Sequence, residues 1–152
     1  MKIITVIGKS DTGKTTLIKS VYESLKRQGA FVLYYDVTGA HYEDIRAVVI
    51  WRGKTIAFCS IGDWADDDYK INGDLWHLSY IKEGIEIARG KEADILINAL
   101  TSNIQEDDYK KLLRNIFSND TYISCNMQSN IFQKDCIKQN QEKLESIIKE
   151  IS

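Results

Sequence analysis

The sequence has few of the residues that form disulfides and zinc sites. Its 152 residues include no proline, three cysteines and two histidines. The cysteines are odd in number and have no C-x-x-C spacing, and Cys59 and Cys125 lie in apolar runs, where a thiol behaves as a small hydrophobic side chain. We therefore expect buried, reduced thiols. A zinc site would need more ligands than the isolated His41 and His77 provide, so none is predicted.

Long apolar runs and clusters of positive charge are also missing. No apolar stretch approaches the length of a membrane span, and no run of lysine or arginine exceeds two residues. With 20 basic and 22 acidic residues, the formal net charge is −2. Nothing here supports a nucleic-acid partner or a polybasic membrane patch. Because an apolar strand is expected directly after Met1 and Lys2, leaving no room for a signal sequence, we expect a cytoplasmic protein.

The composition supports one globular domain. Hydrophobic residues make up 43% of the chain and charged residues 28%, the balance of a folded soluble protein. A chain of 152 residues is long enough for one α/β domain with a substantial core and too short for two ordinary domains. We find no repeat, low-complexity tract or linker. The sequence therefore predicts a single α/β domain over residues 1–152.

The most informative stretch covers residues 3–16. The apolar run IITVI is followed by GKSDTGKT, a full match to the pattern G-x-x-x-x-G-K-[ST]. The β-branched run predicts a buried parallel strand, and Gly8 and Gly13 allow a tight turn whose N–H groups face inward. Apolar residues then recur at helical spacing from Leu17 to Leu25. The loop therefore leads into a helix N-terminus, where partial positive charge favours a bound phosphate.

Through GKSDTGKT the sequence resembles the P-loop nucleoside-triphosphatase superfamily. The resemblance implies that backbone amides around Thr12 to Thr15 hold the inner phosphates of a nucleotide, and that Lys14 reaches the outer ones. It also implies a Mg²⁺ position for the Thr15 hydroxyl. The implied nucleotide-binding residues are Gly8, Lys9, Ser10, Asp11, Thr12, Gly13, Lys14, Thr15 and Thr16. The motif is specific for phosphate binding and does not define the reaction.

The rest of the chain alternates apolar strand patterns with helical ones. Residues 45–51 and 55–61 flank a short glycine-containing connection suited to an antiparallel hairpin. The pattern predicts a three-layer α/β/α fold, with a mostly parallel sheet, one inserted hairpin and a ligand at the carboxyl edge. The further expected strands are 31–35, 93–100 and 121–125, and the expected helices are 15–28, 75–89, 104–117 and 134–151.

Two carboxylates are expected at the carboxyl edge of the sheet. Asp36 follows the strand 31–35, where it would either contact the metal or a second substrate or simply begin a turn. Asp63 follows the hairpin and precedes three further aspartates, 66–68, which we interpret as a solvated loop. This layout resembles the kinase and GTPase division of P-loop proteins, in which the strand beside the P-loop strand ends in a carboxylate. By position, Asp63 is assigned to the metal or its waters.

These features together predict a Mg²⁺-dependent ATP-binding protein that hydrolyses ATP or transfers its phosphoryl group. Lys14 and Asp63 are the predicted catalytic residues, and Thr15, Asp63 and Asp36 the predicted metal ligands. An N-K-x-D motif, which the Ras-like resemblance would require, is absent, so ATP is favoured over GTP. Two alternatives stay open. One is a nucleotide or small-molecule kinase, weakened by five unclustered arginines, and the other a nucleotide-dependent switch or adaptor with little turnover.

Lys9 suggests one candidate assembly. It occupies the second position of the loop, as does the signature lysine in the G-K-G-G-x-G-K-T loop of ParA-type ATPases, where that lysine reaches the nucleotide of a partner subunit. Ser10 and Asp11 replace the two glycines here. The resemblance implies a nucleotide-dependent homodimer, which would be detected as a mass increase on adding a non-hydrolysable ATP analogue with Mg²⁺.

Overall fold

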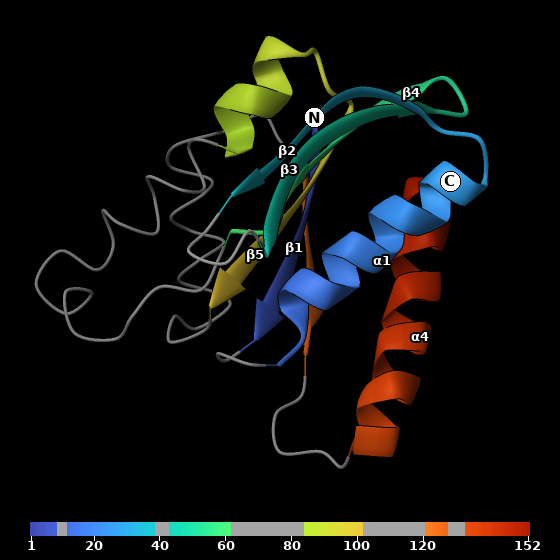
Figure 1. Ribbon diagram of the computed structural model, residues 1–152. Helices are drawn as coiled ribbons and strands as arrows, with labels where there is room; N and C mark the ends of the chain where they lie inside the picture. Colours follow the sequence, from blue (N-terminus) through green and yellow to red (C-terminus); the bar gives the residue numbers. More distant parts are fainter. Residues whose placement is uncertain (9–11, 39–42, 62–83, 102–120, 128–132) are drawn as a thin grey trace, which may run out of the picture.

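The computed structural model describes residues 1–8, 12–38, 43–61, 84–101, 121–127 and 133–152 (Figure 1). Six strands form one sheet in the order β2-β3-β4-β5-β1-β6. Strand β1 pairs in parallel with both β5 and β6, and β4 pairs in parallel with β5. The chain is therefore a mixed α/β protein with a mostly parallel sheet, as predicted. The strands are β1 (Lys2–Gly8), β2 (Phe31–Thr38), β3 (Asp44–Trp51), β4 (Lys54–Cys59), β5 (Ile95–Thr101) and β6 (Thr121–Asn126).

The predicted antiparallel hairpin is confirmed as β3 and β4. The register pairs Trp51 with Lys54, so Arg52 and Gly53 form a two-residue turn. Both turn residues have positive φ, 50° for Arg52 and 75° for Gly53, as the tight turns that match strand twist require. Strand β3 therefore runs antiparallel to β4 and to the strands that are parallel with β4. Its first residue, Asp44, lies at the edge of the sheet where β1 and β4 end.

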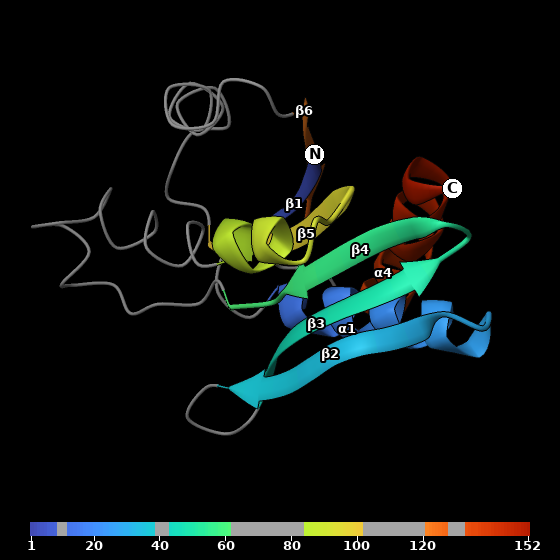
Figure 2. The same ribbon diagram turned by 90° about the horizontal axis from the view of Figure 1, so that it is seen from above.

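The helices cover the sheet on two faces. Helices α1 (Lys14–Arg27) and α4 (Gln133–Ile151) contact each other and lie on one face, where Leu17, Phe58 and Ile147 belong to the larger buried cluster (Figure 2). Residues 84–90 are helical and place Ile85 and Ala88 on the opposite face, in a second buried cluster. None of the helices in the described segments has the length and apolar composition needed to cross a bilayer.

Helix α1 ends as its sequence predicts. Gly29 adopts φ 88°, and its N–H donates to the carbonyl of Lys26 at 3.0 Å. The N–H of Ala30 donates to the carbonyl of Leu25 at 2.9 Å. These two bonds give partners to carbonyls in the last turn of the helix that have none within the helix. The left-handed conformation of Gly29 is one that glycine adopts most easily. The chain then enters β2 directly.

The cysteines match the expectation of reduced thiols. None of the three, which all lie in described segments, forms a disulfide; Cys59 is buried as expected, whereas Cys136 is exposed. Cys125 is half-buried, and burial raises the pKa of its thiol, while the nearby charge of Lys143 acts in the opposite direction. A raised thiol pKa disfavours the thiolate, so Cys125 is less reactive than an exposed cysteine.

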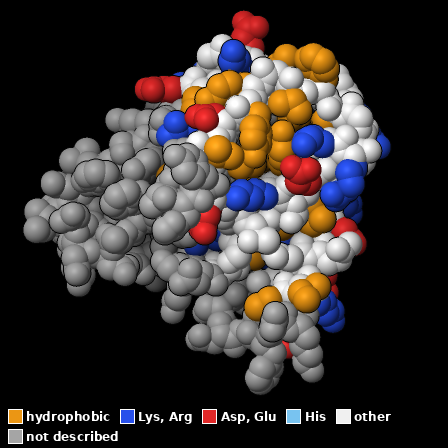
Figure 3. All heavy atoms as spheres, in the orientation of Figure 1, with side chains coloured by type: hydrophobic (Ala, Val, Ile, Leu, Met, Phe, Trp, Pro, Cys, Tyr) orange, Lys and Arg blue, Asp and Glu red, His pale blue; other side chains and the backbone are white. Residues whose placement is uncertain are grey.

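Two features of the sheet differ from the predictions. Strand β2 continues to Thr38, because its last residues pair with the start of β3, and Asp36 therefore lies inside the strand. In addition, β5 lies between β4 and β1. The strand beside β1 is thus not the one that precedes Asp63, so the layout by which Asp63 was assigned to the metal is not present. The outer surface over β2 carries a group of hydrophobic side chains (Figure 3).

Candidate functional site

The site is built where β1 ends and α1 begins. Strand β1 brings Gly8 to the carboxyl edge, and Gly13, with φ 85°, precedes the first residue of the helix. The carbonyl of Gly13 accepts the N–H of Leu17 at 2.9 Å, which starts the helical bonding. No side-chain hydrogen bond caps this N-terminus within the described residues, and the first turn holds no acidic residue. A helix end of this kind favours an anion.

Gly8 is required by close packing. A Cβ atom at this position would collide with the side chain of Thr12 and would lie 3.0 Å from Cβ of Met127. We expect Gly8→Ala to lower the free energy of unfolding by about 1–3 kcal/mol, the usual cost of overpacking. Gly90→Ala is the matched control, because no atom lies within 4 Å of the added methyl group. Denaturant titration of both variants measures the difference, and equal midpoints would contradict this close packing.

The three residues that follow Gly13 differ in exposure. Lys14 is almost completely buried, with 3% of its surface exposed, whereas Thr15 is half-buried and Thr16 exposed. Burying an ammonium group is costly unless anionic or polar groups surround it. A buried lysine at a helix N-terminus therefore adds to the positive potential of the loop.

Thr15 is hydrogen-bonded to a carboxylate, Asp44, that is not among the predicted site residues. Its hydroxyl Oγ1 donates to Oδ1 of Asp44 at 3.1 Å. The same carboxylate oxygen accepts the Ser60 hydroxyl at 2.8 Å. Ser60 is fully buried and is itself fixed, since its Oγ accepts the Ile45 N–H at 2.9 Å and its N–H donates to the Ile45 carbonyl at 3.0 Å. The two ends of the hairpin thus hold Asp44 against the loop threonine.

Asp44 was missed because carboxylates were sought only after strands. In an antiparallel strand the first residue, not the last, lies at the carboxyl edge of its parallel neighbours. The hairpin prediction already implied this arrangement, so an acidic residue directly before the first hairpin strand was the available signal. Asp44 satisfies it.

A hydroxyl and a carboxylate form a donor set that fits Mg²⁺. This ion prefers oxygen ligands and is commonly held by one or two protein groups, with water and phosphate oxygens completing its shell. No group of three or more His, Cys, Asp or Glu side chains suited to a metal occurs among the described residues. Thr15 and Asp44 together suit an ion shared with a phosphate.

The opposite side of the loop is formed by α4 and the end of β6. Both terminal atoms of the Asn140 amide and Cε of Met127 lie 3.9 Å from the position of a Cβ built on Gly13. The Met127 N–H donates to the Ile7 carbonyl at 2.7 Å, which fixes it beside β1. Oδ1 of Asn140 is buried and, in the described part of the chain, has no hydrogen-bond partner. The helical pattern of 134–151 gave no reason to select Asn140.

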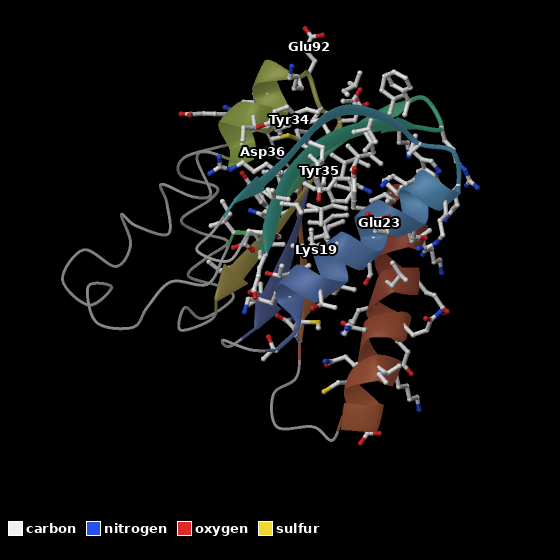
Figure 4. All side chains as sticks on the ribbon, viewed as in Figure 1. Lys19, Glu23, Tyr34, Tyr35, Asp36 and Glu92 are labelled. Carbon is white, nitrogen blue, oxygen red and sulfur yellow. The ribbon has the colours of Figure 1, made fainter. Side chains whose placement is uncertain are left out.

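Asp36 lies on the edge strand rather than beside Thr15. It is exposed and opposite Arg46, and its side chain accepts a hydrogen bond from the Tyr34 hydroxyl at 3.5 Å (Figure 4). Its metal role stays a prediction.

Several predicted positions lie outside the described residues. These are Lys9, Ser10, Asp11, His41, Asp63, the aspartates 66–68, His77 and the helix 104–117.

Comparison with other proteins adds no assignment. No protein-family model matches the sequence, and a search of curated proteins finds no match.

Proposed function

We propose that this protein is a P-loop nucleoside triphosphatase that binds ATP with Mg²⁺ and either hydrolyses it or transfers its terminal phosphoryl group. The observation that carries the proposal is the 3.1 Å hydrogen bond between Thr15 of the loop and Asp44. A G-x-x-x-x-G-K-[ST] match can occur by chance, but a chance match gives no reason for its threonine to meet a supported carboxylate. The pair supplies two hard oxygen ligands beside a helix N-terminus.

The arrangement of the helices supports a three-layer α/β/α fold for this function. Helices α1 and α4 pack on one face of the sheet and residues 84–90 on the other. The loop then lies at the carboxyl edge, where ligands of open α/β sheets bind.

Each residue of the site has a distinct role in the proposal. The N-terminus of α1 holds the phosphates, and the buried Lys14 ammonium offsets the charge that develops on the outer ones. Thr15 and Asp44 would hold Mg²⁺, which when bound neutralises charge on the β- and γ-phosphate oxygens. Asp63 remains a candidate for the waters of the metal.

The two sides of the loop suggest how the nucleotide lies. Asp44 is on the β3 side of Thr15, whereas Asn140 and Met127 are on the α4 side of Gly13. A triphosphate with its outer end at Thr15 would direct the nucleoside toward α4. The preference for ATP over GTP comes from the absence of an N-K-x-D motif in the sequence.

The test is titration of the purified full chain with Mg-ATP and Mg-GTP by calorimetry. We expect saturable binding that is tighter for ATP. At a ligand concentration 100 times Kd, binding should also raise the free energy of unfolding by about 2.7 kcal/mol. Absence of saturable binding to folded protein would refute the proposal. Phosphate release and ³¹P NMR with candidate acceptors then separate hydrolysis from transfer, and negligible turnover with tight binding would identify a switch.

A further inference from the structure

Strand β2 presents large apolar side chains to solvent at the edge of the sheet. Phe31 is 66% exposed, Leu33 45%, Tyr35 50% and Val37 37%, and the neighbouring Ile50 of β3 is 39% exposed. Strand β2 is the first in the sheet order, so its outer edge has no paired strand in the described structure. Figure 3 shows hydrophobic side chains gathered over this part of the sheet. Soluble proteins rarely leave such an edge open.

The usual protection of an edge strand is weak here. The sequence FVLYYDVT contains no lysine, proline or glycine, and Asp36 is its one charged residue. A register shift between Val32 and Tyr34 is the single irregularity along its pairing with β3. Edge strands are commonly shielded by charges, prolines or bulges. Seven of the eight residues of β2 are therefore uncharged and do not oppose pairing with another strand.

One exposed side chain of β2, Tyr35, is anchored to the core. Tyr35 stacks on Tyr22 of α1, with ring centroids 5.4 Å apart and planes at 20°. Tyr22 in turn meets the fully buried Phe58 edge-on at 5.7 Å. A side chain held in this way loses little conformational freedom when a partner covers it, which favours binding.

We propose that β2 pairs antiparallel with β2 of a second copy of this chain, so that the two sheets become one. A strand that pairs with its own copy about a twofold axis forms a closed dimer and needs no second surface. Antiparallel pairing also moves the two Asp36 carboxylates toward opposite ends of the interface, whereas parallel in-register pairing would place them side by side. The exposed apolar residues of each copy would cover those of the other.

The charges beside β2 suit the same partner. Figure 4 shows Lys19 and Glu23 on the side of α1 near Tyr35. Lys26 lies beside them, with its Nζ 3.5 Å from Oε2 of Glu23 and 5.3 Å from the centroid of the Tyr22 ring. When the twofold axis is perpendicular to the sheet, antiparallel pairing of the two β2 strands leaves both α1 helices on the same face of the joined sheet. Each flank then offers both signs of charge to an identical flank, which is self-complementary.

This dimer does not depend on the nucleotide. Antiparallel pairing directs the two carboxyl edges, and hence the two P-loops, in opposite directions. It therefore differs from the assembly implied by Lys9, in which one subunit reaches the nucleotide of the other.

The test is the mass of the full chain by light scattering and sedimentation equilibrium without nucleotide. We expect twice the chain mass of 17.4 kDa, that is 2 × 17.4 = 34.8 kDa. Phe31→Lys and Leu33→Lys should each weaken self-association by about 30-fold or more, as loss of a hot-spot residue of an interface does. Ile137→Lys is the matched control, because Ile137 is 69% exposed on α4, and its mass should stay that of the dimer.

Circular dichroism shows whether each variant is folded, and hydrogen exchange provides a second measurement. Amides on the outer edge of β2 should be protected in the parent and should lose protection in Phe31→Lys, while amides of β1 should not change. A monomeric parent would overturn the proposal, as would a dimer that Ile137→Lys disrupts and both β2 variants retain. A dimer that forms only with Mg-ATP would also overturn it, while leaving the nucleotide-binding proposal intact.

Discussion

Lys14→Ala is expected to reduce the affinity for Mg-ATP by roughly 100-fold. A hydrogen bond to a charged group contributes about 1.5–3 kcal/mol, and the buried Lys14 ammonium is expected to contact more than one phosphate oxygen. Phosphate release should fall with binding if the protein is an enzyme. Calorimetry gives the affinity, and a phosphate assay at saturating ATP gives the turnover.

Two controls keep this result interpretable. Lys14→Met preserves much of the side-chain volume and removes the charge, so it separates loss of packing from loss of electrostatic attraction. Lys26→Ala removes an exposed lysine from the other end of the same helix and should bind ATP like the parent. Unchanged affinity in a folded Lys14→Met protein would contradict the assigned role of this lysine.

Asp44→Asn is expected to lower the affinity for Mg²⁺ in the presence of ATP, on the order of 10–100-fold. Asparagine keeps an acceptor oxygen for Thr15 and Ser60, so the two hydrogen bonds to that position can persist while the negative charge is lost. Titration of Mg²⁺ at fixed ATP measures the midpoint. Binding of ATP without metal should change little or improve, because a carboxylate next to the phosphates repels them.

Asp36→Asn is the informative counterpart. Asp36 is a predicted metal ligand, but it lies on the exposed edge strand, where its side chain accepts the Tyr34 hydroxyl. We expect its Mg²⁺ midpoint to match that of the parent. If Asp36→Asn shifted the midpoint and Asp44→Asn did not, the metal site would have to be sought near the end of β2.

The fold was predictable where local chemistry decides it. The glycine at position 29 ends α1, and Arg52-Gly53 adopts the turn that joins two apolar segments, because each requires a backbone conformation that few residues accept. The alternation of elements then favoured a mostly parallel sheet. Strand order was less accessible, since no local signal determines that β5 comes between β1 and β4.

The candidate site was predictable only in its continuous part. The loop, the helix N-terminus and Thr15 are neighbours in sequence, so one motif identifies them together. Asp44 and Asn140 reach the loop from elements far along the chain, 29 and 125 residues after Thr15 (44 − 15 and 140 − 15). Their partnership depends on strand direction and helix packing, which a single sequence does not specify residue by residue.

The reciprocal bonds between Ile45 and Ser60 have a thermodynamic consequence. They close the open end of the hairpin before any ligand arrives, so the backbone next to Asp44 is already ordered. Ordering one residue of a free loop costs about 1–2 kcal/mol, and here that entropy is lost during folding instead of during ligand capture. Heat-capacity and entropy changes on metal binding should therefore resemble those of a rigid receptor, without the signature of a segment that orders around its ligand.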